Sequence, residues 1–148
     1  MNETTAGNVD RALVLTYRLK IAATVLAWCL PLLFVGRSQL QALGLDPDPS
    51  MMPLRMLGWA YVALCVGYTA GLRAALAGRV ETGPIDVGIV SNGGAALMLA
   101  GHGALGLWDT WHPMLGFHLW GSALVAGGIA AALVAARLRQ RPARRAIA

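Results

Sequence analysis

The sequence predicts an all-α integral membrane protein, a single membrane domain built as a four-transmembrane-helix bundle. Of its 148 residues, 57% are hydrophobic and 13% are charged, whereas soluble domains carry about 25% charged residues. Four long stretches contain no charged residue, and the Lys and Arg residues gather near the chain ends and between these stretches. So few charges cannot coat a water-soluble surface of this size, and the basic residues are typical of membrane-flanking segments.

The four charge-free stretches predict the positions of the helices, because a helix needs about 20 residues to cross the hydrocarbon core. The last two stretches meet this length outright. The first two meet it when the flanking Lys and Arg side chains extend to the headgroups. The charge-free stretches are 21–36, 56–72, 87–108 and 110–136, and the predicted helices are 17–37, 54–76, 84–107 and 113–137.

The first helix is expected after a polar tail, 1–10, and an interfacial segment, 11–20. A basic lead followed by an apolar run is also typical of a signal peptide. The sequence after Gly36 has no small-residue cleavage motif, so we expect a retained helix. Segment 46–50 contains two prolines and cannot be helical, which predicts an external loop before the second helix.

Helix-start signals precede the third and fourth helices. Gly83 and Pro84 are followed by Asp86, whose negative charge suits the positive end of a helix dipole. His112 and Pro113 mark the start of the fourth helix in a similar way.

The distribution of basic residues predicts the orientation, because such residues in short loops resist translocation. Ten lie in the amino-terminal segment, the second connection and the carboxyl-terminal tail, whereas Arg37 and Arg55 alone lie on the opposite side. We therefore expect a multi-pass protein of the cell membrane with both termini in the cytoplasm, where 1–10 and 138–148 form polar tails.

Small residues at four-residue spacing predict close helix contacts, which membrane helices need because lipid tails are as apolar as leucine. These rows are Ala63, Gly67, Gly71 and Ala75; Ala96, Ala100 and Ala104; and Ala123, Gly127, Ala131 and Ala135. They fit packing within one bundle and packing between copies equally well, so both arrangements stay open.

Polar residues within the predicted spans supply the candidate ligand-binding residues, Asn92, His102 and His118. The Asn92 amide needs a partner, either on a neighbouring helix or on a ligand. His102 and His118 lie toward the predicted outer side, where tryptophans and methionines also occur. The plain alternative is an interhelical hydrogen bond for Asn92 and an interfacial position for both histidines.

Several kinds of chemistry find no support in the sequence. No acidic residue lies deep in a predicted span, which argues against a proton-coupled exchanger that uses an intramembrane carboxylate. Cys29 and Cys65 form no Cys-x-x-Cys pair, and the glycine-rich segment 101–106 lies within a predicted helix rather than between a strand and a helix. We expect no catalytic residue, metal, cofactor or nucleic-acid partner.

Three functions remain open at this stage. The first is a noncatalytic protein of the lipid bilayer that self-associates or serves as an accessory subunit of a larger membrane complex. The second is a transporter or binding protein for a small apolar molecule that uses an outer-side pocket. The third is an outer-side haem or copper site made from histidines and methionines. The scarcity of intramembrane ionisable groups favours the first.

Overall fold

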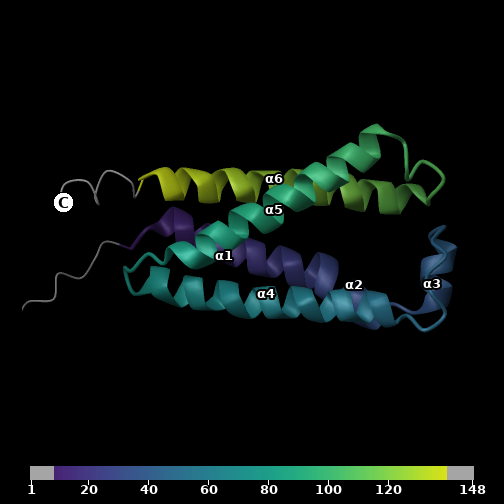
Figure 1. Cartoon of the computed structure of the whole chain (residues 1–148), viewed down its shortest axis with the longest axis horizontal. Helices are drawn as coiled ribbons and strands as arrows, with labels where there is room; N and C mark the ends of the chain where they lie inside the picture. Colours follow the sequence, from purple (N-terminus) through teal and green to yellow (C-terminus); the bar gives the residue numbers. More distant parts are fainter. Residues whose placement is uncertain (1–8, 140–148) are drawn as a thin grey trace, which may run out of the picture.

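A computed structural model describes residues 9–139, and this part of the chain consists of helices joined by loops, with no strand. The long helices lie side by side in an elongated shape (Figure 1). The elements are α1 (Arg11–Thr24), a π-helical turn (Val25–Cys29), α2 (Leu30–Phe34), α3 (Arg37–Ala42), α4 (Met52–Leu76), α5 (Thr82–Ala104) and α6 (Pro113–Arg139). Most of both predicted tails lies outside the described residues.

The bundle has two different ends, which we call the basic end and the loop end. At the basic end α1 begins, α4 is connected to α5, and α6 ends; α3 and the α5–α6 connection lie at the loop end (Figure 1). The described arginines of the basic end are Arg11, Arg73, Arg79, Arg137 and Arg139. Asp86 accepts a hydrogen bond from Arg137 over 2.9 Å and so joins α5 to α6 at this end.

Three helices are long and apolar enough to cross a membrane: Arg11–Phe34, Met52–Leu76 and Pro113–Arg139. The third predicted helix, 84–107, corresponds to α5, which falls outside this set. Three of the four predicted spans therefore have the required length and hydropathy, whereas α5 has the length but too low a mean hydropathy, and a fourth span stays a prediction. Asp86, Asn92 and His102 are polar residues within the sequence of α5 and lower its mean hydropathy, and its glycines add little to it.

The first span differs in its bounds from the predicted helix 17–37. It begins at Arg11, where the Asp10 carboxylate accepts a hydrogen bond from the Leu13 backbone N–H over 3.1 Å and caps the helix. The interfacial segment 11–20 is thus part of the helix itself. A π-helical turn immediately precedes α2, whose second residue is Pro31. Proline has no N–H and crowds the preceding turn, so a widened turn there keeps the helix continuous.

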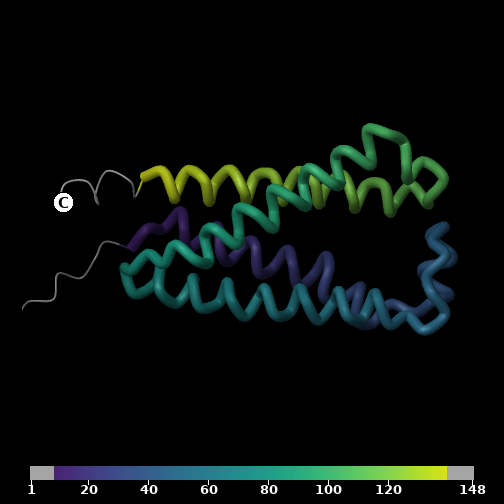
Figure 2. The backbone as a smooth tube through the Cα atoms, in the orientation of Figure 1, coloured from purple at the N-terminus to yellow at the C-terminus, as the bar shows by residue number. Residues whose placement is uncertain are grey.

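Small residues bring the helices together in two pairs, α1–α2 with α4 and α5 with α6. A Cβ added at Gly71 of α4 would lie 2.9 Å from the Tyr17 ring, and one at Gly88 of α5 would lie 2.5 Å from Leu133. Both glycines therefore sit where a side chain of a neighbouring helix already fills the space. Figure 2 shows α5 running obliquely, close to α4 at the basic end and away from it toward the loop end.

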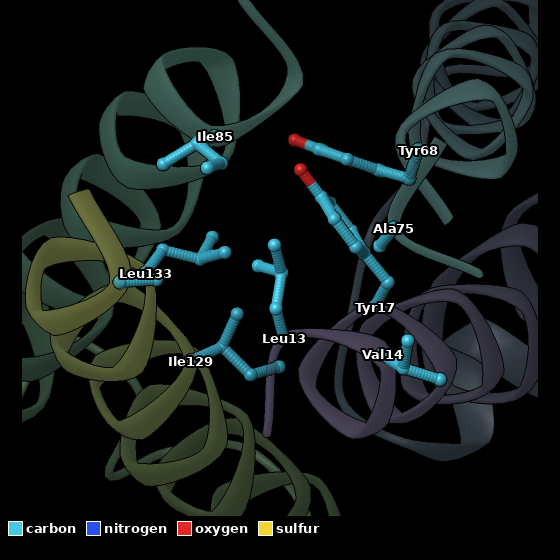
Figure 3. Packing of buried hydrophobic residues seen from close by; sticks show 9 residues of the cluster. Leu13, Val14, Tyr17, Tyr68, Ala75, Ile85, Ile129 and Leu133 are labelled. Carbon is cyan, nitrogen blue, oxygen red and sulfur yellow. The ribbon is translucent and has the colours of Figure 1, made fainter. Parts of the chain in front are cut away.

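The buried core lies at the basic end, where all four long helices meet (Figure 3). Ile85 and Leu133 are 0% exposed, and Tyr17 and Tyr68 are each 1% exposed. In Figure 3 the hydroxyl groups of both tyrosines point in the same direction, toward the side of Ile85. The core residues are Leu13, Val14, Tyr17, Tyr68, Ala75, Ile85, Ile129, Leu133 and Ala136.

Polar contacts with the backbone close the loop end. The Arg55 guanidinium donates hydrogen bonds to the carbonyl oxygens of Leu32 and Val35, over 2.6 and 2.8 Å, and so caps the end of α2. The His112 backbone N–H donates to the Leu43 carbonyl oxygen over 3.0 Å. Gly44 adopts φ +83°, and a Cβ there would lie 3.2 Å from the Trp111 Cα atom. The loop after α3 and the loop before α6 are thus in direct contact.

Candidate functional site

The loop end contains an apolar cavity of about 710 Å³, which we call the loop-end cavity. Its walls come from the second half of the first span, the loop after α3, the start of α4 and the start of α6. Asp46 and Asp48 lie at its exposed rim, and His118 is a polar residue of its wall. The lining includes Trp28, Pro31, Leu32, Leu43, Met51, Leu54, Leu57, Trp111, Met114, Leu115 and Leu119.

The course of α5 explains why this end is hollow. The oblique course of α5 carries it away from α4, and no α5 residue lines the cavity. Side chains of loop 43–51, such as Leu43 and Met51, and of the start of α6 line the space instead. The loop-end cavity thus occupies the part of the bundle that α5 leaves unfilled.

An aromatic cluster forms one wall of the cavity. The Trp28 ring lies 5.8 Å from the Tyr61 ring with 29° between their planes, and 5.6 Å from the His118 ring, measured between centroids. Such contacts fix ring orientation through the edge and face charges of the aromatic systems. Trp28 and His118 therefore present ordered faces to the cavity.

A second groove, which we call the inner groove, continues from this wall toward the basic end. It has a volume of about 310 Å³ and lies between the first span, α5 and α6. Ala27, Trp28 and His118 line both the inner groove and the loop-end cavity, so the two spaces adjoin. Its polar lining residues are Thr24, Asn92, His118 and Ser122.

Lys20 lies one helical turn from Thr24 and is 4% exposed; it is not itself a lining residue of the inner groove, but it contacts Asn92, which is. Its amine donates a hydrogen bond to the Asn92 Oδ1 atom over 2.7 Å and lies 4.3 Å from the centre of the Tyr68 ring. Asn92 in turn donates through Nδ2 to the Gly88 carbonyl oxygen over 2.6 Å. A buried cation at this depth is therefore held by an amide and an aromatic face.

Two tyrosine hydroxyls extend this polar cluster toward the basic end. The Tyr68 hydroxyl lies 2.7 Å from the Ser91 Oγ atom, a hydrogen bond between α4 and α5. The Tyr17 hydroxyl is buried without a hydrogen-bond partner among residues 9–139. The rings of Tyr17 and Tyr68 lie 6.4 Å apart, which places the unpartnered hydroxyl close to the cluster.

The structure brings two of the three predicted ligand-binding residues together. Asn92 and His118 both line the inner groove. His102 lies elsewhere, with an exposed side chain whose Nδ1 atom donates to the Met98 carbonyl oxygen over 2.8 Å. Neither the loop-end cavity nor the inner groove includes His102 in its lining.

The three histidines have separate contacts and do not meet at one site. The His112 Nδ1 atom accepts a hydrogen bond from the Met114 backbone N–H over 3.3 Å at the start of α6. His102 bonds within α5, and His118 packs on Trp28. Within residues 9–139 no group of three His, Cys, Asp or Glu side chains could hold a metal ion. The haem or copper hypothesis receives no support from this arrangement.

Sequence reasoning missed Lys20, which it treated as a flanking charge that extends to the headgroups. A signal was present, because Leu13, Tyr17, Lys20 and Thr24 follow one another at helical spacing and share a face of α1. Three of these positions suit a buried face, so Lys20 lies on the face that packs into the bundle. Its partner, Asn92, was correctly expected to need a polar contact on a neighbouring helix.

The carboxylates at the rim lie outside the spans. The Ser50 hydroxyl and backbone N–H both donate to the Asp48 carboxylate. These bonds favour the ionised form and hold the pKa of Asp48 below its usual range. Arg37 lies 3.9 Å from Asp46 on the surface. The mouth of the loop-end cavity is therefore polar and charged, unlike its interior.

No known protein family, curated protein or solved structure matches this chain.

Proposed function

We propose that this protein is a noncatalytic four-span membrane protein that binds a small apolar or weakly polar molecule in the loop-end cavity. The observation that carries the proposal is the cavity itself, about 710 Å³ in volume and lined almost entirely by apolar side chains. Small-molecule sites are typically clefts of about 300–1,000 Å³ with apolar walls and a few polar groups. His118 and the aromatic ring of Trp28 are such orienting groups here.

The course of the chain supports a fourth crossing by α5. Both α4 and α6 run from the loop end to the basic end (Figure 1). If these two helices cross the membrane, α5 must return the chain over the same distance. Two of the polar groups that lower its hydropathy are partnered by neighbouring helices, Asp86 by Arg137 at the exposed basic end and Asn92 by Lys20 inside the bundle. Such pairing reduces the cost of placing polar groups in lipid.

The distribution of arginines supports an orientation with the basic end in the cytoplasm. Five described arginines lie at this end, whereas Arg37 and Arg55 lie at the loop end. The Arg55 guanidinium donates hydrogen bonds to backbone carbonyl groups, so this charge stabilises the end of α2. In this orientation the loop-end cavity faces the outer side of the cell membrane, and both termini are cytoplasmic.

Tryptophan fluorescence tests the proposed ligand site, because Trp28 and Trp111 line the cavity whereas Trp59 is an exposed residue of α4. The protein is placed in phosphatidylcholine nanodiscs and titrated with dibromostearyl alcohol, whose bromines quench nearby indoles. We expect quenching that saturates in wild type and in Trp59→Phe, but not in the Trp28→Phe/Trp111→Phe double variant. Quenching that stays linear in wild type would reject the site.

A second candidate function is self-association, alone or within a larger membrane complex. The supporting observation is that Gly93, Gly94, Gly121 and Gly128 have open space where a Cβ would lie. Such faces let a second helix approach closely. Cross-linking in nanodiscs tests this candidate, with Gly94→Leu and Gly128→Leu expected to reduce dimer yield. An unchanged monomer population across dilution would contradict it.

A further inference from the structure

We propose that the polar head of the ligand is a carboxylate, held by Lys20 at the inner end of the inner groove, so that the ligand is a single-chain amphiphilic acid. This inference rests on the proposed function, because the apolar chain of such a ligand would occupy the loop-end cavity. It adds the chemical class of the ligand and the residue that recognises it.

The first step concerns the charge of Lys20. Within residues 9–139, no Asp or Glu oxygen lies within 4.0 Å of its amine, although the side chain is 4% exposed. A cation buried in a membrane-spanning bundle is costly unless it is paired, and such residues usually mark sites for substrates or ions. An anionic ligand would supply the missing countercharge.

The second step concerns the hydrogen bonds that the amine can make. An ammonium group has three N–H donors, and one of them is directed to Asn92. The Tyr68 ring face stabilises the charge but accepts no conventional hydrogen bond. Among the described residues the amine has no second hydrogen-bond acceptor, so two donors are available to a carboxylate.

The third step is the path between Lys20 and the cavity. Lys20, Thr24, Ala27 and Pro31 follow one another along one face of the first span, over about 16 Å at 1.5 Å per residue. Thr24 and Ala27 line the inner groove, whereas Ala27 and Pro31 line the cavity. A linear molecule with its head beside Lys20 would therefore extend through the groove and place its chain among the apolar side chains of the cavity.

The fourth step selects a carboxylate over a bulkier anion. The inner groove measures about 310 Å³ and is lined by small residues such as Ala23, Gly121 and Ala126. Lys20 supplies one positive charge, and no arginine lines either space. One charge and a narrow passage suit a carboxylate on a single chain. A phospholipid, with two chains and a larger head, exceeds this space.

The experiment compares dibromostearate with dibromostearyl alcohol in phosphatidylcholine nanodiscs, at a pH where the acid is ionised. Both probes carry the same brominated chain and differ in head charge. We expect wild type to bind the acid about tenfold more tightly than the alcohol, as for a hydrogen bond between charged groups. Lys20→Gln keeps a donor for Asn92 but removes the charge, so both probes should then bind equally. Arg18→Gln, at an exposed position two residues away, is the matched control and should keep the preference.

A second variant keeps the inference testable if Lys20→Gln fails to fold. Asn92→Asp places a carboxylate of similar shape on the Lys20 amine, which should preserve the fold and remove the preference for the acid. Equal binding of acid and alcohol by wild type would overturn this inference and leave the proposed ligand site intact. Saturable quenching by neither probe would overturn both proposals, and an acid preference that persists in Asn92→Asp would exclude Lys20 as its source.

Discussion

The basic end and the loop end of the molecule are both lined by apolar side chains, but the first is a packed core and the second contains a cavity. At the basic end, side chains of neighbouring helices occupy the space beside Gly71 and Gly88, and α1, α4, α5 and α6 share one core. At the loop end α5 departs from α4, and a cavity of about 710 Å³ takes the place of that core. The buried core is thus concentrated at one end, and the proposed ligand space lies at the other.

The largest expected effect is on the packed core. Leu133→Ala removes a side chain that is 0% exposed, and we expect unfolding in detergent to become easier by about 3 kcal/mol. Leu54→Ala, in the wall of the loop-end cavity, should cost about 1 kcal/mol, because a space already adjoins it. Denaturant titration followed by circular dichroism measures both. Equal losses would contradict the difference between the two ends.

The next effect concerns the cluster between the ends. Asn92→Leu removes the acceptor of the Lys20 amine and should cost about 2 kcal/mol, as expected for a hydrogen bond to a charged group. Asn92→Asp retains an acceptor for the amine but loses the donor to the Gly88 carbonyl oxygen, so it should cost less than Asn92→Leu in the same denaturant titration. A stable Asn92→Leu variant would show that the amine has found another partner.

A smaller effect separates the two core tyrosines. Tyr68→Phe loses the hydrogen bond to Ser91 and should destabilise the protein by about 1 kcal/mol. Tyr17→Phe removes a hydroxyl that has no partner among the described residues, so it should be neutral or slightly stabilising. Thermal melts of both variants compare them directly, and a reversed order would indicate a partner for Tyr17 that the cluster does not show.

The smallest expected change in stability comes from filling the loop end. Ala27→Phe places a ring where the inner groove and the cavity adjoin, and should change stability by less than about 1 kcal/mol while blocking saturable quenching. Gly88→Ala, at the basic end, adds one carbon 2.5 Å from Leu133 and should cost more, about 1–3 kcal/mol. Retained quenching in a folded Ala27→Phe variant would place the ligand elsewhere.

Much of the helical layout could be predicted, because helix starts and breaks are local. Pro113 begins α6 and the residues of 46–50 are not helical. Run length alone left the span of α5 unconfirmed, because its polar residues lower its hydropathy although two of them find partners on neighbouring helices. Of the three predicted ligand-binding residues, Asn92 and His118 share the inner groove whereas His102 does not, and their role in binding stays a prediction.

The amino-acid sequence by itself determined that the chain is helical, where its apolar helices lie, and that its positive charge gathers at one end, because these properties depend on residues close together in the chain. Only the tertiary structure decided that Lys20 pairs with Asn92, 72 positions away, and that the loop end stays hollow. Both outcomes depend on the oblique crossing of α5, which arises from contacts between distant side chains and therefore has no local signature.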